Sequence, residues 1–131
     1  MRILDEKIDN VLDTAHFRYV QLDGAIIKVF NKTADEFTSD PRAYRIVFNS
    51  EEEARTKYEE IKKEAGWFVF KWSDKPTLLN TFGFARIFIS KSGPSDKVVY
   101  SVVFYNSEND SVSIRCVSYE SALEILKELA G

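Results

Sequence analysis

Hydrophobic residues recur along the chain with two periods, one helical and one in which every second position is apolar. From Ile3 to Leu12 the apolar positions follow helical spacing, which predicts an amphipathic helix over residues 2–14. The aspartates of this segment fall on another face of that helix, where stacked like charges are typical of a solvated surface rather than of a cation site. We therefore expect a surface helix before the first strand.

A period of two then dominates and predicts strands. Asp23-Gly24 stands between the first two β-rich runs and predicts a hairpin, because a type I′ turn needs positive φ at both central residues. Polar residues 31–42 predict a loop that includes a short strand near Phe37. The main predicted strands are residues 17–22, 25–30, 43–48, 67–72, 82–89, 97–104 and 111–117.

Two further helices have clear start signals. Ser50 and Glu53 form a capping box, in which each side chain bonds the backbone N–H of the other residue. A helix over residues 51–65 follows, and Gly66 suits a left-handed cap at its end. The last helix, residues 119–130, also follows a serine and carries apolar residues on one face.

These elements predict an α+β protein with antiparallel meander sheets of about seven strands and three helices. The strand–serine–helix segments 44–54 and 112–122 resemble each other, which favours pseudo-repeats over residues 17–66 and 67–131. Chance similarity between two such units is the alternative. The length of 131 residues predicts a single domain.

Composition and charge limit the partners and the cellular location that we expect for this protein. The net charge is −3, but the excess acid lies in the predicted helices 2–14 and 51–65. The single cysteine cannot form an intramolecular disulfide, which favours a reducing, cytoplasmic location. We expect no membrane partner, because no apolar run is long enough for a membrane helix, and the acidic first residues are unlike a signal peptide.

Residues for catalysis are scarce. His16 has no neighbouring pattern of ligands or triad partners, and Cys116 alternates with apolar residues as a core thiol does. The nucleotide-binding, zinc-protease and serine-hydrolase motifs are missing from the sequence. We therefore expect a non-enzymatic protein with no catalytic residues, no metal site and no cofactor.

The charges on the predicted strands are more informative. Each of the main strands carries one basic residue and no acidic one. A row of bases without acids creates a local positive field even on an acidic protein. Basic residues on strands also protect sheet edges from aggregation, which is the alternative explanation. The basic residues are Arg18, Lys28, Arg45, Lys71, Arg86, Lys97 and Arg115.

The predicted strand 82–89 adds aromatic residues to this pattern. Alternation places Phe82, Phe84, Arg86 and Phe88 on one face and small or aliphatic residues on the other. Bases of a single-stranded nucleic acid stack on such rings, and arginine binds phosphate. The strand 67–72 adds either Phe68, Phe70 and Trp72 or the alternate set to this surface. Alternatively, these rings fill a core or a dimer interface.

Two resemblances concern this region. Phe82-Gly83-Phe84 matches part of the RNA-recognition-motif signature, but Asn80 and Thr81 replace its preceding basic residue and glycine. No helix is predicted between this strand and the next, so that family is not assigned. The order of elements over residues 17–131 is similar to that of the Whirly and PUR-repeat single-strand binders. That resemblance implies nucleic acid along the sheets and helices behind them.

The sequence therefore predicts a non-enzymatic protein that binds single-stranded DNA or RNA on an aromatic and basic sheet face. The alternative is a protein-interaction or assembly module, a homodimer or an adaptor, that uses exposed aromatics and strand edges. A homo-oligomer is expected in either case. The predicted nucleic-acid-binding residues are Phe82, Phe84, Arg86, Phe88, Lys71, Trp72, Arg45, Arg115, Lys28 and Arg18.

Overall fold

The computed structural model describes residues 1–31, 42–71, 73–108 and 110–130. The chain divides into two compact units, Met1–Thr81 (unit 1) and Phe82–Gly131 (unit 2). The short strand predicted near Phe37 lies outside the described residues.

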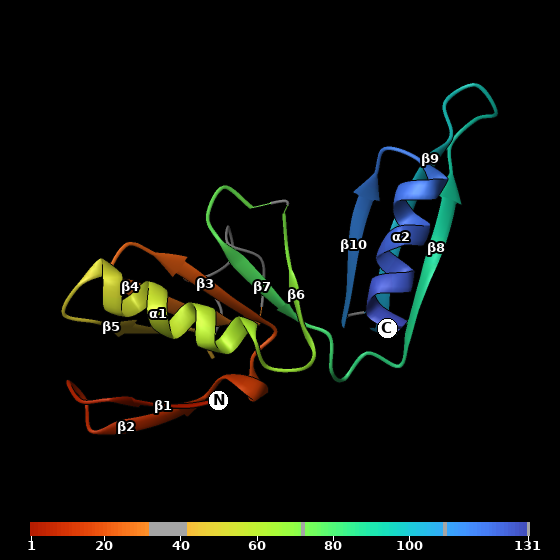
Figure 1. The fold of residues 1–131 in the computed structure, drawn as a ribbon. Helices are drawn as coiled ribbons and strands as arrows, with labels where there is room; N and C mark the ends of the chain where they lie inside the picture. Colours follow the sequence, from red (N-terminus) through yellow and green to blue (C-terminus); the bar gives the residue numbers. More distant parts are fainter. Residues whose placement is uncertain (32–41, 72, 109, 131) are drawn as a thin grey trace. The chain divides into compact units, whose positions relative to one another are not determined.

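Unit 1 contains two antiparallel sheets and one α-helix (Figure 1). A two-stranded hairpin is followed by a 3-10 turn and then by a five-stranded sheet of order β5-β4-β3-β7-β6. The elements are β1 (Arg2–Asp5), β2 (Asn10–Asp13), η1 (Thr14–His16), β3 (Tyr19–Asp23), β4 (Ile26–Phe30), β5 (Tyr44–Val47), α1 (Glu51–Lys62), β6 (Trp67–Val69) and β7 (Thr77–Asn80).

Unit 2 is a three-stranded antiparallel meander followed by a helix (Figure 1). Its elements are β8 (Arg86–Ser92), β9 (Val99–Ser107), β10 (Asp110–Cys116) and α2 (Tyr119–Ala130). The last helix thus has the predicted bounds. Among the described residues, no helix has the length and apolar character needed to cross a membrane.

The predicted helix over residues 2–14 is wrong, because this segment forms the β1–β2 hairpin. Ile3 pairs with Leu12 and both are buried, whereas the neighbouring pair of Leu4 and Val11 is exposed. Asp9 has a positive φ of 49° where the chain turns. Two adjacent apolar residues at each end of a polar stretch are compatible with both a helical period and the strand period of two. Burial of alternate residues against the five-stranded sheet favours the hairpin.

The hairpin predicted at Asp23-Gly24 is confirmed, but its turn differs from the prediction. Asp23 pairs with Ile26, so the central residues are Gly24 and Ala25. Only Gly24 has positive φ, at 60°, as in a type II′ turn and not the expected type I′ turn.

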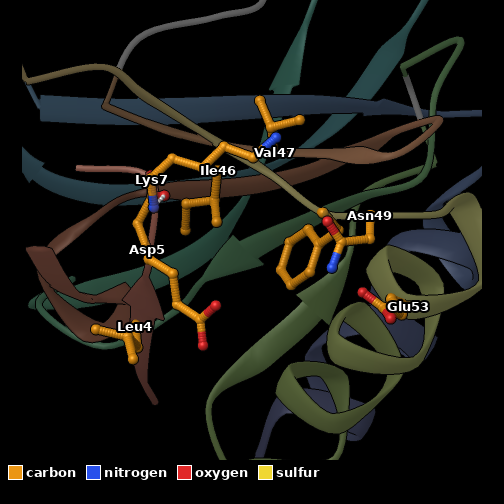
Figure 2. Close-up of a pocket in the computed structure, with 9 residues that line it drawn as sticks. Leu4, Asp5, Lys7, Ile46, Val47, Asn49 and Glu53 are labelled. Carbon is orange, nitrogen blue, oxygen red and sulfur yellow. Dashed lines mark hydrogen bonds between the residues drawn. The ribbon is translucent and has the colours of Figure 1, made fainter. Parts of the chain in front are cut away.

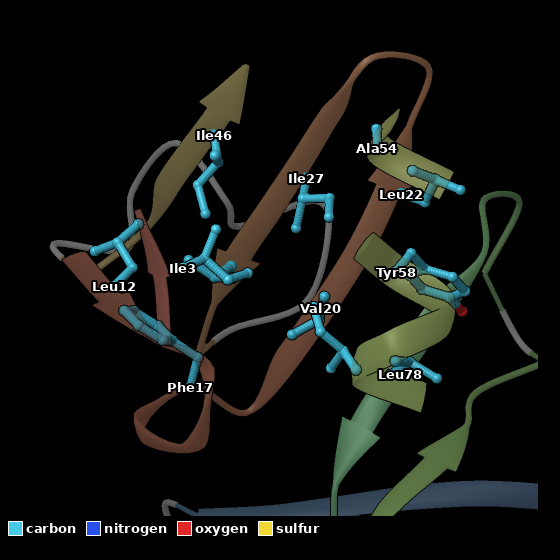
Figure 3. Close-up of a cluster of buried hydrophobic side chains, with 12 residues drawn as sticks. Ile3, Leu12, Phe17, Val20, Leu22, Ile27, Ile46, Ala54, Tyr58 and Leu78 are labelled. Carbon is cyan, nitrogen blue, oxygen red and sulfur yellow. The ribbon is translucent and has the colours of Figure 1, made fainter. Parts of the chain in front are cut away.

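One face of the five-stranded sheet holds a large cluster of buried apolar side chains in unit 1. Val20, Ile27 and Leu78 are completely buried there. Figure 3 shows the hairpin residues Ile3 and Leu12 gathered at one end of this cluster and α1 at the other. Burying each such side chain stabilises the fold by about 1.5–3 kcal/mol, and this shared apolar face fixes the hairpin and the helix on one side of the sheet.

Local signals set the limits of α1. Ser50 has extended backbone, and its hydroxyl accepts a 3.1 Å hydrogen bond from the N–H of Glu53, which confirms the predicted N-cap. The helix ends at Lys62, a few residues earlier than expected, and Gly66 adopts a positive φ of 92° in the following turn.

In unit 2, α2 covers one face of the meander. Val102, Phe104 and Ile114 lie on that face and are buried together with Ala122 of the helix. The rings of Tyr100 and Tyr119 meet edge to face at 5.7 Å between centroids. The opposite face of the meander is therefore the one that α2 leaves open.

The antiparallel α+β class is confirmed, but the details of the fold prediction are not. The described residues form ten strands in three sheets with two α-helices, in place of about seven strands and three helices. The hairpin and the unpredicted β7 account for three added strands. Each unit contains a three-stranded meander followed by a serine-capped helix, and the two compact units divide at Thr81/Phe82.

Candidate nucleic-acid interface

The open face of the unit 2 meander carries both arginines of this unit that were predicted to bind nucleic acid. Cross-strand partners in an antiparallel sheet point to the same side, so the register defines this face. We call these residues the platform: Arg86, Phe88, Ser90 and Ser92 from β8, Val99, Ser101, Val103 and Tyr105 from β9, and Ser111, Ser113 and Arg115 from β10. None of these residues is acidic. Among the described residues of β8–β10 the acidic one is Asp110, which pairs with Ser107 next to the Tyr105 end of the platform and accepts a 3.1 Å hydrogen bond from the side-chain amide of Asn106.

Arg86 and two aromatic rings form a cluster at one end of the platform. The Arg86 guanidinium lies 4.3 Å from the centroid of the Phe88 ring, a cation–π contact. Tyr105 is the cross-strand partner of Arg86, and its ring meets that of Phe88 edge to face at 6.5 Å. Arg86 and Tyr105 are exposed and Phe88 is half-buried, so a planar ligand has access to this cluster.

Arg115 lies at the diagonally opposite end of the platform. It is exposed and pairs across the sheet with Ser101. Two strand spacings and the four residues from Ser101 to Tyr105 along β9 separate it from Arg86, which amounts to roughly 16 Å. Across the described part of the chain, neither guanidinium has a carboxylate within 4.0 Å. Both charges are therefore available to an anionic ligand.

The prediction that Phe84 shares a face with Arg86 and Phe88 is wrong. Residues 82–85 precede β8, and Gly83 has a positive φ of 88° that interrupts the predicted alternation. The Phe84 ring packs 5.5 Å from that of Phe104, on the face that α2 covers. Phe82 is 64% exposed and lies outside the strand.

The predicted basic residues of unit 1 are placed differently. The ammonium of Lys28 lies 2.8 Å from the Asp23 carboxylate, and Lys75 approaches the same oxygen at 2.9 Å. Hydrogen bonds from Lys28 and then from Lys75 lower the pKa of Asp23 to about 2. Arg18 donates a 3.2 Å hydrogen bond to the carbonyl of Asn80. The charges of Lys28 and Arg18 thus already interact with polar groups of their own unit.

The remaining described candidates of unit 1 are Arg45 and Lys71. Arg45 is exposed and pairs across the sheet with Lys28. The rings on the same face, Tyr19 and Phe30, stack at 5.2 Å and are buried. Lys71 is exposed after β6, and Trp72 lies outside the described residues. The structure therefore brings Arg86, Phe88 and Arg115 onto one face, and the other described candidates are not on it.

Sequence reasoning missed Tyr105 and the serines of the platform. Alternation along the predicted strand 97–104 stops one residue before Tyr105, and β9 extends to Ser107. The pattern of alternate residues in β9 and β10 could have placed Tyr105 and Ser113 on one face, but pairing of the strands was needed to join them to Arg86.

A small pocket in unit 1 has a different character. It measures about 210 Å³ and lies between the β1–β2 hairpin, the end of β5 and the start of α1. Figure 2 shows Leu4 and Asp5 on one side and Asn49 and Glu53 on the other. Asp5 is buried, and its carboxylate accepts a hydrogen bond from the N–H of Lys7 at 3.2 Å. The pocket is smaller than the roughly 300–1,000 Å³ of ordinary ligand sites.

His16 and Cys116, the residues with catalytic or metal-binding side chains that the sequence analysis considered, are not platform residues. His16 is exposed, and the thiol of the half-buried Cys116 contacts the carbonyl of Ile114 at 3.6 Å. Within the described ranges, no three His, Cys, Asp or Glu side chains converge as metal ligands. Comparison of the chain with protein-family models, curated proteins and solved structures finds no match.

Proposed function

We propose that this protein binds single-stranded nucleic acid on the platform of unit 2. The observation that carries the proposal is a sheet face with two aromatic rings and two arginines, neither of which has a described carboxylate within 4.0 Å. Asp110, the acidic residue of these strands, pairs with Ser107 at the margin of this face. Phosphates of the ligand meet Arg86 and Arg115, and a base stacks on the cluster around Phe88 and Tyr105. Such stacking contributes about 1–3 kcal/mol for each base.

Binding of fluorescent oligonucleotides, followed by anisotropy, tests this proposal. Wild-type protein binds a single strand at low salt, and affinity falls as salt rises because counterions are released. Arg86→Ala and Arg115→Ala each weaken binding and each lower the salt slope by about 0.7, the value for one phosphate contact on a single strand.

Lys91→Ala is the matched control. Lys91 is a basic residue of the same strand as Arg86, but it pairs with Tyr100 and therefore points to the face of the sheet that α2 covers. Its removal changes the net charge by the same amount and leaves binding nearly unchanged. Absence of binding at low salt, or equal losses in Lys91→Ala and Arg86→Ala, would contradict the proposal.

A second candidate function is assembly through the β1–β2 hairpin, a surface that favours the interaction-module alternative. Leu4, Ile8 and Val11 are 58%, 59% and 55% exposed, and Leu4 pairs directly with Val11. Neighbouring aliphatic side chains exposed to this degree are typical of an interaction site. Light scattering of wild type and of a Leu4→Ser/Val11→Ser variant tests it: an oligomer that the double substitution dissociates supports this function, and a monomeric wild type excludes self-assembly.

A further inference from the structure

We infer that the platform prefers RNA over DNA and that its serine hydroxyls read the ribose 2′-hydroxyl. This inference rests on the proposed binding of single-stranded nucleic acid and adds the class of sugar that the site recognises. The observation behind it is the set of serines on the platform: Ser90, Ser92, Ser101, Ser111 and Ser113.

These serines lie between and beside the proposed anchors for phosphates and bases. Ser101 is central, because it pairs with Ser90 on one side and with Arg115 on the other. Ser111 pairs with Tyr105, and Ser113 pairs with Val103. A strand that reaches from Arg115 to Tyr105 therefore passes over serine hydroxyls.

The hydroxyls have hydrogen-bonding capacity to offer. In the part of the chain that the structure describes, the side chains of Ser90, Ser101, Ser111 and Ser113 make no hydrogen bond. Each hydroxyl both donates and accepts, and so does the ribose 2′-hydroxyl. Deoxyribose has only hydrogen at that position and cannot form this contact. Small side chains also allow a sugar to approach the sheet closely.

Charge alone does not distinguish the two sugars. Arg86 and Arg115 meet phosphates, which RNA and DNA share. Serine hydroxyls that bonded only phosphates would strengthen the binding of both polymers equally. A preference for ribose, lost when serines are removed, is therefore specific to 2′-hydroxyl recognition.

The experiment compares oligomers of uridine and 2′-deoxyuridine of equal length, which differ only at the 2′ position. Anisotropy titrations of the full chain at fixed low salt give both affinities. We expect the uridine oligomer to bind about fivefold more tightly, the effect of roughly one net hydrogen bond. Ser101→Ala and Ser113→Ala lower the affinity for the uridine oligomer, leave that for deoxyuridine unchanged and bring the ratio toward one.

Ser95→Ala is the matched control, because Ser95 is exposed in the connection between β8 and β9 and lies outside the platform. Circular dichroism verifies that each variant is folded. Equal affinities of wild type for the two oligomers, or a preference that survives both serine substitutions, overturn the inference and leave the proposed function standing. Failure to bind either oligomer overturns the proposed function itself.

Discussion

Two phenylalanines close together in the sequence have opposite surroundings in the structure. Phe84 packs against the buried Phe104, whereas Phe88 lies on the platform beneath Arg86. We expect Phe84→Ala to destabilise the fold by about 2 kcal/mol with little effect on oligonucleotide affinity, because it removes packing from the helix-covered face. Phe88→Ala weakens affinity roughly tenfold with a small effect on stability.

Urea unfolding and anisotropy on the same pair of variants measure both effects. The pair serves as its own control, since each variant loses one phenyl ring. A loss of affinity in Phe84→Ala with no loss of stability would mean that the ligand binds on the face that α2 covers and not on the platform.

Asp23 provides a residue-scale prediction about pH. Its pKa is lowered to about 2 by Lys28 and Lys75, from an ordinary value of 3.8. A carboxyl with a lowered folded-state pKa stabilises the protein above its unfolded value and loses this contribution as pH falls toward the folded value. Because the side chain is partly exposed, we expect Asp23→Asn to cost only about 1 kcal/mol at pH 7.

That cost should shrink as the pH falls from about 5 toward 2, where protonation removes the charge of wild-type Asp23 as well. Urea unfolding of wild type and variant at several pH values measures the difference. A cost that stays constant down to pH 2 would show that the two ion pairs do not contribute.

At the scale of elements, the N-cap of α1 makes a simple test. The Ser50 hydroxyl accepts the N–H of Glu53, one of the donors that the first helical turn leaves unsatisfied. We expect Ser50→Ala to destabilise the protein by about 1 kcal/mol and Ser50→Asp to retain most of the stability. Thermal unfolding compares them, and equal stability of the alanine variant and wild type would refute the cap.

Elements with local signals were predictable and those without them were not. Ser50 and Glu53 define a helix start within a few residues, and Gly24 supplies the positive φ that the β3–β4 turn requires. The hairpin of β1 and β2 has no comparable signal, since Ile3 and Leu12 fit both periods. Strand β7 was missed because its residues Thr77–Asn80 are all buried and so do not alternate.

At the scale of the whole molecule, the two units have cores of different size. Unit 2 buries Val102, Phe104, Ile114 and Ala122 among its described residues, while unit 1 buries a larger cluster around the five-stranded sheet. A small core gives less stability against local opening. We therefore expect backbone amides of β9 to exchange with solvent faster than those of β3 and β4.

Native-state hydrogen exchange measures this difference. Destabilising each unit separately, with Ile27→Ala in unit 1 and Phe104→Ala in unit 2, provides the comparison, because each should raise exchange mainly in its own unit. Equal protection of β9 and β3 would mean that the chain opens as one cooperative body.

The sequence by itself determined the antiparallel α+β class and two of the helices, because turn, cap and alternation signals act between near neighbours. It also supplied the residue types of the proposed site. Only the tertiary structure decided that the first segment is a hairpin, that Phe84 and Phe88 lie on opposite faces, and that Arg86, Tyr105, Ser101 and Arg115 share one surface. Those outcomes depend on which strands pair and which face α2 buries. Burial between distant segments settles both, and no local pattern encodes it.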